Sequence, residues 1–240
     1  MHVLVSGANR GLGLGLVKEL LKFEEVKNVY ATHRHWADIS ELMAINDPRL
    51  HVIVMELMDN ITIGSVYVTI RDTVCNDGLN CIINNAAVFE SYDIDNKANR
   101  KAIMDKIEIN SVGPMIMCQS FLPQLRKAVK GGNKAMIVNI SDELASMEKC
   151  KGSTDRKAIV YQMSKTGMNM MARSMAADAN DDGVTLLSMT TGHVRDAMGG
   201  QDAETTVDEA AKDIIDCVLH KIKNEHTGGF YDRKMNSVPF

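Results

Sequence analysis

A tyrosine and a lysine four residues apart are the pair best suited to proton transfer in this chain. Tyr161 and Lys165 open a helical pattern, in which residues i and i+4 lie on one face. The Lys165 ammonium is then expected to approach the Tyr161 phenol and to lower its pKa from the ordinary value of about 10. Such a tyrosine can donate a proton to a carbonyl oxygen during hydride transfer. For this spacing alone, an exposed helical pair is the alternative.

Asn110 is a second candidate for chemistry. It lies in the middle of a predicted helix, and Gly113 and Pro114 follow it closely. This order predicts a kink or a bulge in the helix. A local break of that kind can hold a water molecule that relays protons, whereas an asparagine on the helix surface is the alternative.

A glycine-rich turn near the N-terminus has the composition of a pyrophosphate site. It follows a predicted strand at 2–6 and leads into a predicted helix that starts at Leu14. Glycines allow a sharp turn and a close approach of the backbone, and the helix end offers free N–H groups and a positive dipole. The spacing is Gly-x-x-x-Gly-x-Gly, and a plain turn is the alternative. The turn comprises Gly7, Ala8, Asn9, Arg10, Gly11, Leu12 and Gly13.

Two arginines indicate which dinucleotide this turn would bind. An NAD site usually has an acid after the second strand to hold the ribose 2′-OH, but here His33 and Arg34 follow that strand. Arg34 together with Arg10 suits a 2′-phosphate, so NADP(H) is the expected cofactor. The alternative for Arg34 is a solvated surface arginine.

Small and polar residues also follow the fourth predicted strand, in the order Asn84, Asn85, Ala86 and Ala87. Small side chains let a dinucleotide pass close to the backbone, and asparagine side chains can tie neighbouring strands together. Ser141 and Asp142 follow the fifth predicted strand.

Short apolar runs alternate with helical patterns along the chain. Runs at 2–6, 28–32, 50–55, 79–84, 135–140 and 184–189 are predicted to be buried parallel strands. Helices are predicted at 14–21, 36–44, 61–75, 97–129, 161–180 and 207–224. The order predicts an α/β fold with one domain, 1–240, and a doubly wound, mostly parallel sheet covered by helices on both faces. The polar segment 148–158 is expected to be a mobile loop, and 195–206 is expected to cover a ligand cleft.

Bulk composition narrows the class of protein. A chain of 240 residues with 45% hydrophobic content can bury one large core, and its net charge is −4. No basic run or acidic tail suggests nucleic acid, and no apolar run is long enough for a membrane span. The five scattered cysteines favour reduced thiols in a cytoplasmic protein over zinc or disulfides. We therefore expect no metal. We also expect no signal peptide, because the first apolar stretch is short and runs straight into the glycine turn.

Taken together and in order, these motifs resemble the short-chain dehydrogenase/reductase family over essentially the whole chain. The motifs are residues 6–13, 84–87, 110–113, 138–141 and the pair Tyr161 and Lys165. Within the family, the chain is most similar to sniffer-type carbonyl reductases and bacterial C-factor-like proteins, through residues 109–128, 161–184, 198–200 and 227–230.

The resemblance implies a Rossmann fold, NADP(H) and a role for each site residue. Tyr161 would be the general acid or base, Lys165 would tune it and hold the nicotinamide ribose, and Asn110 would anchor a relay water. Glu56 and Leu57 would contact adenine. It implies that the cofactor-binding residues are Gly7, Asn9, Arg10, Gly11, Leu12, Gly13, Arg34, Glu56, Leu57, Asn85, Ala86, Ala87, Tyr161, Lys165, Thr191, Gly192, Val194 and Asp196. Family members often dimerise through the helices that start near Lys101 and Tyr161, so a homodimer is expected, with a buried core face as the alternative for the apolar residues of these helices.

Two acids depart from the family pattern. Asp142 takes the place of the usual catalytic serine, and Asp196 takes the place of the usual threonine after the sixth strand. A carboxylate opposes negative charge on a substrate oxygen and can raise the pKa of Tyr161. Three explanations stay open: ligands that exclude water keep Asp142 protonated, Ser141 or Ser146 supplies a hydroxyl after a local shift, or the protein binds NADP(H) and catalyses poorly.

The predicted function is an NADPH-dependent reductase that acts on the carbonyl groups of aldehydes, ketones or quinones. We expect slow reduction that is fastest at mildly acidic pH. The alternative is a catalytically impaired NADP(H)-binding sensor or scaffold with the same fold. Intact Tyr161, Lys165 and Asn110 favour the enzyme, whereas Asp142 and Asp196 favour the alternative.

Overall fold

The computed structural model describes residues 1–93, 95, 97–150 and 156–240. Its centre is a sheet in which every neighbouring pair of strands is parallel, in the order β3-β2-β1-β4-β5-β6-β7. The strands are β1 (His2–Val5), β2 (Asn28–His33), β3 (Leu50–Val54), β4 (Cys81–Asn84), β5 (Ala135–Ser141), β6 (Val184–Thr190) and β7 (Phe230–Asp232). This confirms the predicted α/β Rossmann architecture. Only β7 lies outside the predicted runs, because three residues are too few to form a pattern.

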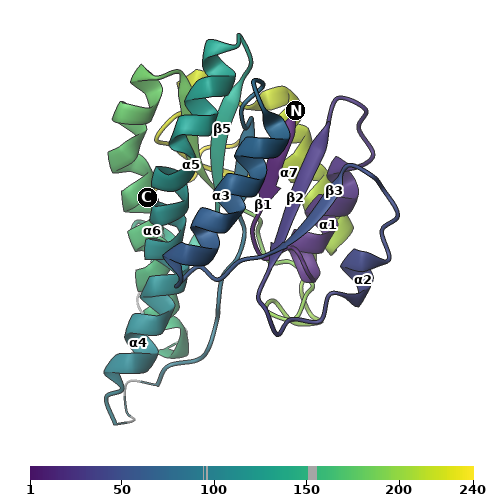
Figure 1. Ribbon diagram of the computed structural model, residues 1–240. Helices are drawn as coiled ribbons and strands as arrows, with labels where there is room; N and C mark the ends of the chain where they lie inside the picture. Colours follow the sequence, from purple (N-terminus) through teal and green to yellow (C-terminus); the bar gives the residue numbers. More distant parts are fainter. Residues whose placement is uncertain (94, 96, 151–155) are drawn as a thin grey trace.

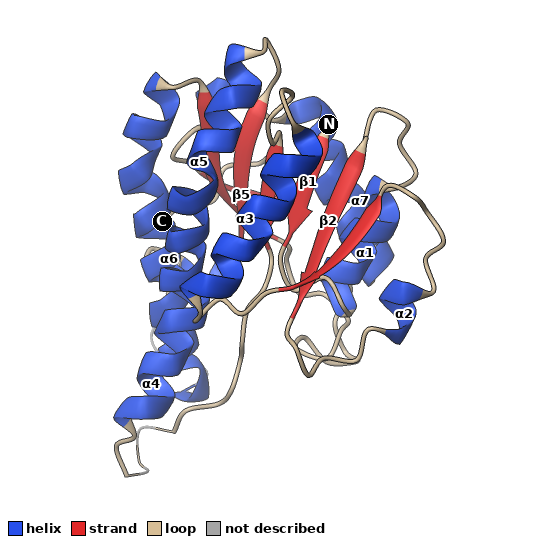
Figure 2. Cartoon of the chain, in the orientation of Figure 1, coloured by secondary structure: helices blue, strands red, loops and turns tan. Residues whose placement is uncertain are grey.

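Helices cover both faces of the sheet (Figures 1 and 2). On one face, α1 (Gly11–Leu20) packs against α7 (Val207–Asp216). On the other lie α3 (Asn60–Val74), α5 (Gly113–Lys130) and α6 (Ile159–Asp181). Each face has its own apolar cluster, and alternate residues of the central strands point into one or the other. This alternation explains why the strands read as continuous apolar runs.

Three predicted helices differ from the structure. The one expected at 36–44 contains only α2 (Ser40–Met43), because a turn from Arg34 to Ala37 comes first and the Asp38 side chain then accepts the Ser40 N–H. The one expected at 97–129 is α4 (Arg100–Ile107), a π-helical segment (Glu108–Val112) and α5. The one expected at 207–224 is α7 followed by a second π-helical segment (Cys217–Lys221).

Three short 3-10 helices complete the fold, the first two near the carboxyl ends of the strands and the third just before β7. They are the 3-10 helices Glu143–Ala145, Arg156–Ala158 and Asn224–His226. Residues 151–155 of the predicted mobile loop lie outside the described part of the chain. Among the described residues, no helix has the length and apolar character needed to cross a membrane. The segments that follow β1 to β6 meet at one edge of the sheet, where the site is built.

Candidate active site

A cavity of about 890 Å³ runs along the carboxyl ends of the strands. Each of the loops after β1 to β6 contributes to its wall. The glycine turn at the start of α1 forms one end of the cavity. Tyr161, at the start of α6, lines the same cavity. This is where ligands bind in open parallel sheets. The structure therefore brings the predicted catalytic and dinucleotide-binding residues to one continuous site, except for Asn110, which is buried next to Ile109 of the wall.

Tyr161 and Lys165 share one face of α6, as their spacing predicts. The Lys165 Nζ lies 5.8 Å from the centroid of the Tyr161 ring and donates a hydrogen bond to the carbonyl of Ile140 at 2.7 Å. The Tyr161 hydroxyl donates to Asp142 Oδ2 at 3.2 Å. Both side chains are buried. The pair is therefore part of the cavity wall and of the core, and the exposed-pair alternative does not apply.

The expected lowering of the Tyr161 pKa is wrong for this protein. Burial of the phenol raises its pKa well above 10, and the charges of Asp142 and Asp196 raise it further. Burial also lowers the pKa of Lys165 to about 8. The lysine cannot offset these effects because it turns toward the strand carbonyl of Ile140. The prediction that Asp142 raises the pKa of Tyr161 is confirmed in direction.

Asn110 lies inside the π-helical segment, which confirms the predicted break in the helix. Pro114 has no N–H to donate to the Asn110 carbonyl, as an α-helical residue at that position would. The Asn110 side chain is fully buried, accepts the Val88 N–H at 2.9 Å and donates to the Val88 carbonyl at 2.9 Å. It also contacts the Ser164 hydroxyl at 3.0 Å. Asn110 therefore fixes the cavity wall after β4 to the helix that bears Tyr161.

Asp142 occupies the cavity wall where the family pattern has a serine. Its Oδ1 accepts the Leu144 N–H at 2.9 Å, and its Oδ2 faces Tyr161. The Ser141 hydroxyl instead donates to Asn169 Oδ1 at 2.7 Å, within the core. Ser146 is also buried, and its hydroxyl accepts the Lys149 N–H. Neither serine presents its hydroxyl beside Tyr161, so a serine substitute would require a local rearrangement.

The glycine turn is held tightly by the segment after β4. A Cβ on Gly7, whose φ is +64°, would lie 2.9 Å from the Cα of Ala86, and a Cβ on Gly13 would lie 2.1 Å from the Gly7 carbonyl oxygen. The Asn85 side chain donates to the carbonyls of Ser6 and Gly7 at 2.9 and 3.1 Å. Asn84 ties β4 to β5 through Asn139 at 2.8 Å, as expected of an asparagine there.

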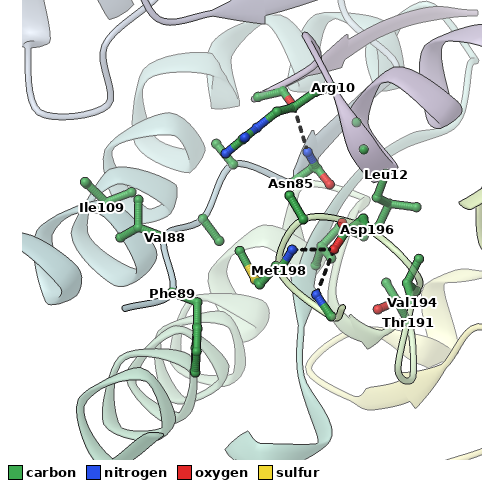
Figure 3. Close-up of a pocket in the computed structure, with 18 of the residues that line it drawn as sticks. Arg10, Leu12, Asn85, Val88, Phe89, Ile109, Thr191, Val194, Asp196 and Met198 are labelled. Carbon is green, nitrogen blue, oxygen red and sulfur yellow. Dashed lines mark hydrogen bonds between the residues drawn. The ribbon is translucent and has the colours of Figure 1, made fainter. Parts of the chain in front are cut away.

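The start of α1 fits a pyrophosphate. Within the described residues, no side chain caps this helix end, and its first turn contains no acid. Its N–H groups and positive dipole therefore remain available to an anion in the cavity. Figure 3 shows Arg10 and Leu12 of this turn beside Asn85 at the cavity. Ala86 and Ala87, both small, continue the wall.

Two arginines and a tryptophan form the far end of the cavity. In the described part of the chain, neither Arg10 nor Arg34 forms an ion pair with a carboxylate. The Arg34 guanidinium lies 5.5 Å from the centroid of the Trp36 ring, and Trp36 is 70% exposed. The Glu56 carboxylate accepts the His35 N–H at 3.1 Å and so holds this loop. Sequence reasoning missed Trp36, although it is the only tryptophan and lies two residues after Arg34.

The loop after β6 covers the cavity with a second acid. Asp196 Oδ1 accepts the N–H groups of Met198 and Gly199 at 2.8 and 2.9 Å (Figure 3). Its Oδ2 lies over the glycine turn, 3.1 Å from where a Cβ of Gly11 would be. Thr191, Gly192 and Val194 line the same wall. The covering role expected of 195–206 is confirmed for residues 195–199.

Apolar residues complete the part of the cavity near Tyr161. Phe89 meets the Tyr161 ring edge-on, with 5.1 Å between the ring centroids. Val88, Ile109, Leu144 and Met198 add to this wall. The sequence offered no signal for Val88, Phe89 and Leu144, which come from loops and a short 3-10 helix, whereas Met198 lies in the segment predicted to cover the cleft. No group of three or more histidine, cysteine or acidic residues suited to a metal occurs among the described residues.

Comparison with known proteins agrees with this geometry. The carbonyl reductase Sniffer of D. melanogaster has a structure with a TM-score of 0.92 and 28% identity, covering 100% of this chain and 99% of that one. The NADPH-bound carbonyl reductase from chicken fatty liver has a TM-score of 0.92 and 29% identity, covering 100% and 94%. The C-signal protein of Myxococcus xanthus is 28% identical over 167 residues, or 70% of this chain and 96% of that protein. The family model for short chain dehydrogenases matches residues 1–206, and the chain thus belongs to the short-chain dehydrogenase family.

Proposed function

We propose that this protein is an NADPH-dependent reductase of small organic substrates, with carbonyl groups of aldehydes, ketones or quinones as the starting expectation. One observation carries the proposal: Tyr161 lines the same cavity as the glycine turn and two arginines, and within the described residues no side chain caps that turn and no carboxylate pairs with either arginine. A dinucleotide site and a proton donor thus share one space. The similarity to carbonyl reductases, one of them NADPH-bound, supports the proposal.

The cofactor end of the cavity suits a dinucleotide with a 2′-phosphate. The N–H groups at the start of α1 would receive the pyrophosphate, and Arg34 with Arg10 would receive the 2′-phosphate. Leu57 lies beside Glu56 in the wall near the expected adenine. Asn9 donates to the Asp38 carbonyl at 3.1 Å, which connects the glycine turn to the loop that bears Arg34. This hydrogen bond would link the expected pyrophosphate site to the expected 2′-phosphate site.

At the reacting end, bound NADPH would supply the hydride. Tyr161 would donate its hydroxyl proton to the substrate heteroatom, and Lys165 would hold the nicotinamide ribose. Asn110 would keep Val88 and the helix of Tyr161 in register. Thr191, Gly192, Val194 and Asp196 would form the wall near the nicotinamide.

We further propose a cytoplasmic homodimer. In the described part of the chain all five cysteines are free, as expected in a reducing compartment. Met117 and Met168 are buried core residues, but Met115, Met163 and Met170 on α5 and α6 are 38%, 48% and 59% exposed. These exposed methionines would supply apolar surface for a second copy.

The direct test of function is NADPH oxidation by the purified protein with and without a quinone, followed by absorbance. We expect quinone-dependent turnover that falls by about a hundredfold or more in Tyr161→Phe, which lacks only the hydroxyl. Tight NADPH binding without any turnover would contradict the reductase and point to a sensor or scaffold.

A further inference from the structure

The position beside the Tyr161 hydroxyl is held by a group that only accepts hydrogen bonds. Asp142 Oδ2 lies 3.2 Å from Tyr161 Oη. A substrate atom that reaches the tyrosine hydroxyl therefore also comes next to this carboxylate. An ionised carboxylate has no hydrogen to donate, and neither has a carbonyl oxygen. A ketone in this position would develop negative charge beside a negative side chain.

The Asp142 carboxylate is a fixed part of the cavity wall. Its Oδ1 accepts the Leu144 N–H at 2.9 Å and so caps the short helix Glu143–Ala145. This bond leaves Oδ2 directed at Tyr161. The residue is half-buried, so the carboxylate is not simply a mobile surface group. Its position makes it a binding group for the reacting end of a substrate.

The charges nearby reinforce this negative position. Asp196 lies close enough to act on Tyr161 together with Asp142. Lys165 is the cation on the same helix face, but its Nζ donates to the Ile140 carbonyl. Burial lowers the pKa of Lys165 to about 8, so its positive charge declines as the pH rises toward and beyond that value. A positive substrate would complete the charge balance of the site.

The walls around this position are apolar. Phe89 packs against Tyr161, and Figure 3 shows Val88, Phe89 and Ile109 together on one side of the cavity. Met198 lies with its sulfur 4.0 Å from the Tyr161 hydroxyl. Aromatic rings attract organic cations, and apolar walls suit a hydrocarbon body. The space fits an apolar molecule with one positive, hydrogen-donating head.

We propose that the substrates of this site are iminium ions, with Asp142 accepting the N–H⁺ of the C=N⁺ group. The inference rests on the proposed reductase function and narrows its substrate class. The positive nitrogen pairs with Asp142, and the apolar body lies against Phe89 and Met198. The carboxylate that would hinder a carbonyl is then the group that selects the substrate.

The chemistry balances without a proton from the protein. NADPH provides two electrons as a hydride, which forms the new C–H bond at the iminium carbon. The π pair of the C=N⁺ bond becomes the lone pair of the amine nitrogen, which keeps its proton. The products are a neutral amine, which then takes a proton from solvent, and NADP⁺. Tyr161 is therefore needed less for an iminium than for a carbonyl.

The test compares 3,4-dihydroisoquinoline, at a mildly acidic pH where it is an iminium ion, with the neutral ketone 1-tetralone. We expect the wild-type protein to favour the iminium in kcat/KM, and Asp142→Ser to lower that preference by about tenfold or more, because it removes the carboxylate and supplies a hydroxyl. Asp105→Asn is the matched control, since its carboxylate faces Lys101 at 2.6 Å on α4, away from the residues that line the cavity. It should keep the wild-type preference.

A binding measurement gives a readout besides turnover. Calorimetry with the protein–NADP⁺ complex should show that tetrahydroisoquinolinium, the protonated product, binds about tenfold more weakly to Asp142→Asn than to wild type. The affinity for NADP⁺ itself should be the same in both proteins. Equal amine affinity in both proteins would overturn the role of Asp142.

The outcomes separate this inference from the proposed function. If the wild-type protein reduces quinones or 1-tetralone but favours no iminium, the iminium inference is wrong and the reductase function stands. If Tyr161→Phe lowers kcat/KM equally for the iminium and for the ketone, the proposal that an iminium needs Tyr161 less than a carbonyl does is wrong. If NADPH binds and no substrate of either class is reduced, both proposals fail.

Discussion

At the residue scale, the site depends on which partner each titratable group faces. Tyr161 faces Asp142, whereas Lys165 faces a backbone carbonyl. Burial and the charge of Asp142 raise the pKa of Tyr161, so the tyrosine keeps its proton at neutral pH. Burial lowers the pKa of Lys165 to about 8. A tyrosine in this state stays protonated, so it is not available as a base and can act only as a proton donor, although as a weaker acid than an ordinary phenol. Reduction is the direction that this arrangement favours.

The Lys165 pKa gives a prediction for stability against pH. The folded value of about 8 lies below the ordinary value of 10.5, so between these values the unfolded chain binds more protons. Lys165 should contribute a rise in stability with pH across this window of up to about 1.4 kcal/mol per unit, complete above 10.5. Buried thiols whose pKa is raised, such as Cys81 and Cys118, lower stability in the same window, so urea unfolding at several pH values isolates the Lys165 contribution as the difference between wild type and a variant. A Lys165→Met variant should lose it, and an identical slope in both would contradict the account.

Arg34 gives a prediction for cofactor choice. Without its guanidinium, the 2′-phosphate of NADPH would lose a charged partner, while NADH has no such group. Arg34→Ala should weaken the binding of NADPH by about tenfold and leave the affinity for NADH nearly unchanged. Quenching of the single Trp36 beside the arginine reports binding directly. Arg71→Ala, on α3 and paired with Asp72, is the control. An equal loss for both nucleotides would count against a 2′-phosphate site.

At the element scale, the helix break between α4 and α5 connects the segment after β4 to the helix that bears Tyr161. The π-helical segment directs Asn110 into the core, where it meets the backbone of Val88 and the hydroxyl of Ser164. A regular helix would change the direction of every side chain after the break. Pro114 favours the break because it withholds one helical hydrogen bond.

Replacing Asn110 should therefore affect stability and activity together. Asn110→Ala leaves the N–H and the carbonyl of Val88 without their buried partner, which costs about 2 kcal/mol or more. Asn99→Ala removes the exposed cap of α4 and costs about 1 kcal/mol, with little effect on turnover. Chemical unfolding and kcat of both variants check this pair. A loss of activity in Asn99→Ala as large as that in Asn110→Ala would argue against a specific role for the break.

At the scale of the whole molecule, the parallel sheet makes the site predictable in outline. Because parallel strands end at one edge, residues as distant in sequence as Arg10, Arg34 and Tyr161 must meet there. The sequence therefore predicts the parallel strands, the glycine turn and the catalytic pair. It also predicts the helix break from the order Asn110, Gly113 and Pro114.

What the sequence could not predict depends on contacts between distant segments. The rise in the Tyr161 pKa follows from burial and from the position of Asp142, and neither is visible in helical spacing. The direction of Ser141 follows from Asn169, on a helix that packs behind β5. Phe89 comes from an irregular loop without a periodic pattern. Trp36 falls in a segment that reads as a helix but forms a turn.

The measurement that tests the central claim most directly is isotope transfer from NADPH carrying deuterium at the reactive position of the nicotinamide. Both diastereomeric forms would be used, with a substrate that the protein turns over, and the product would be analysed by mass spectrometry. The account predicts one deuterium at the reduced carbon from one of the two forms, and far less product from Tyr161→Phe. Product without deuterium from either form, or no product while NADPH is bound, would contradict the claim that this cavity performs hydride transfer.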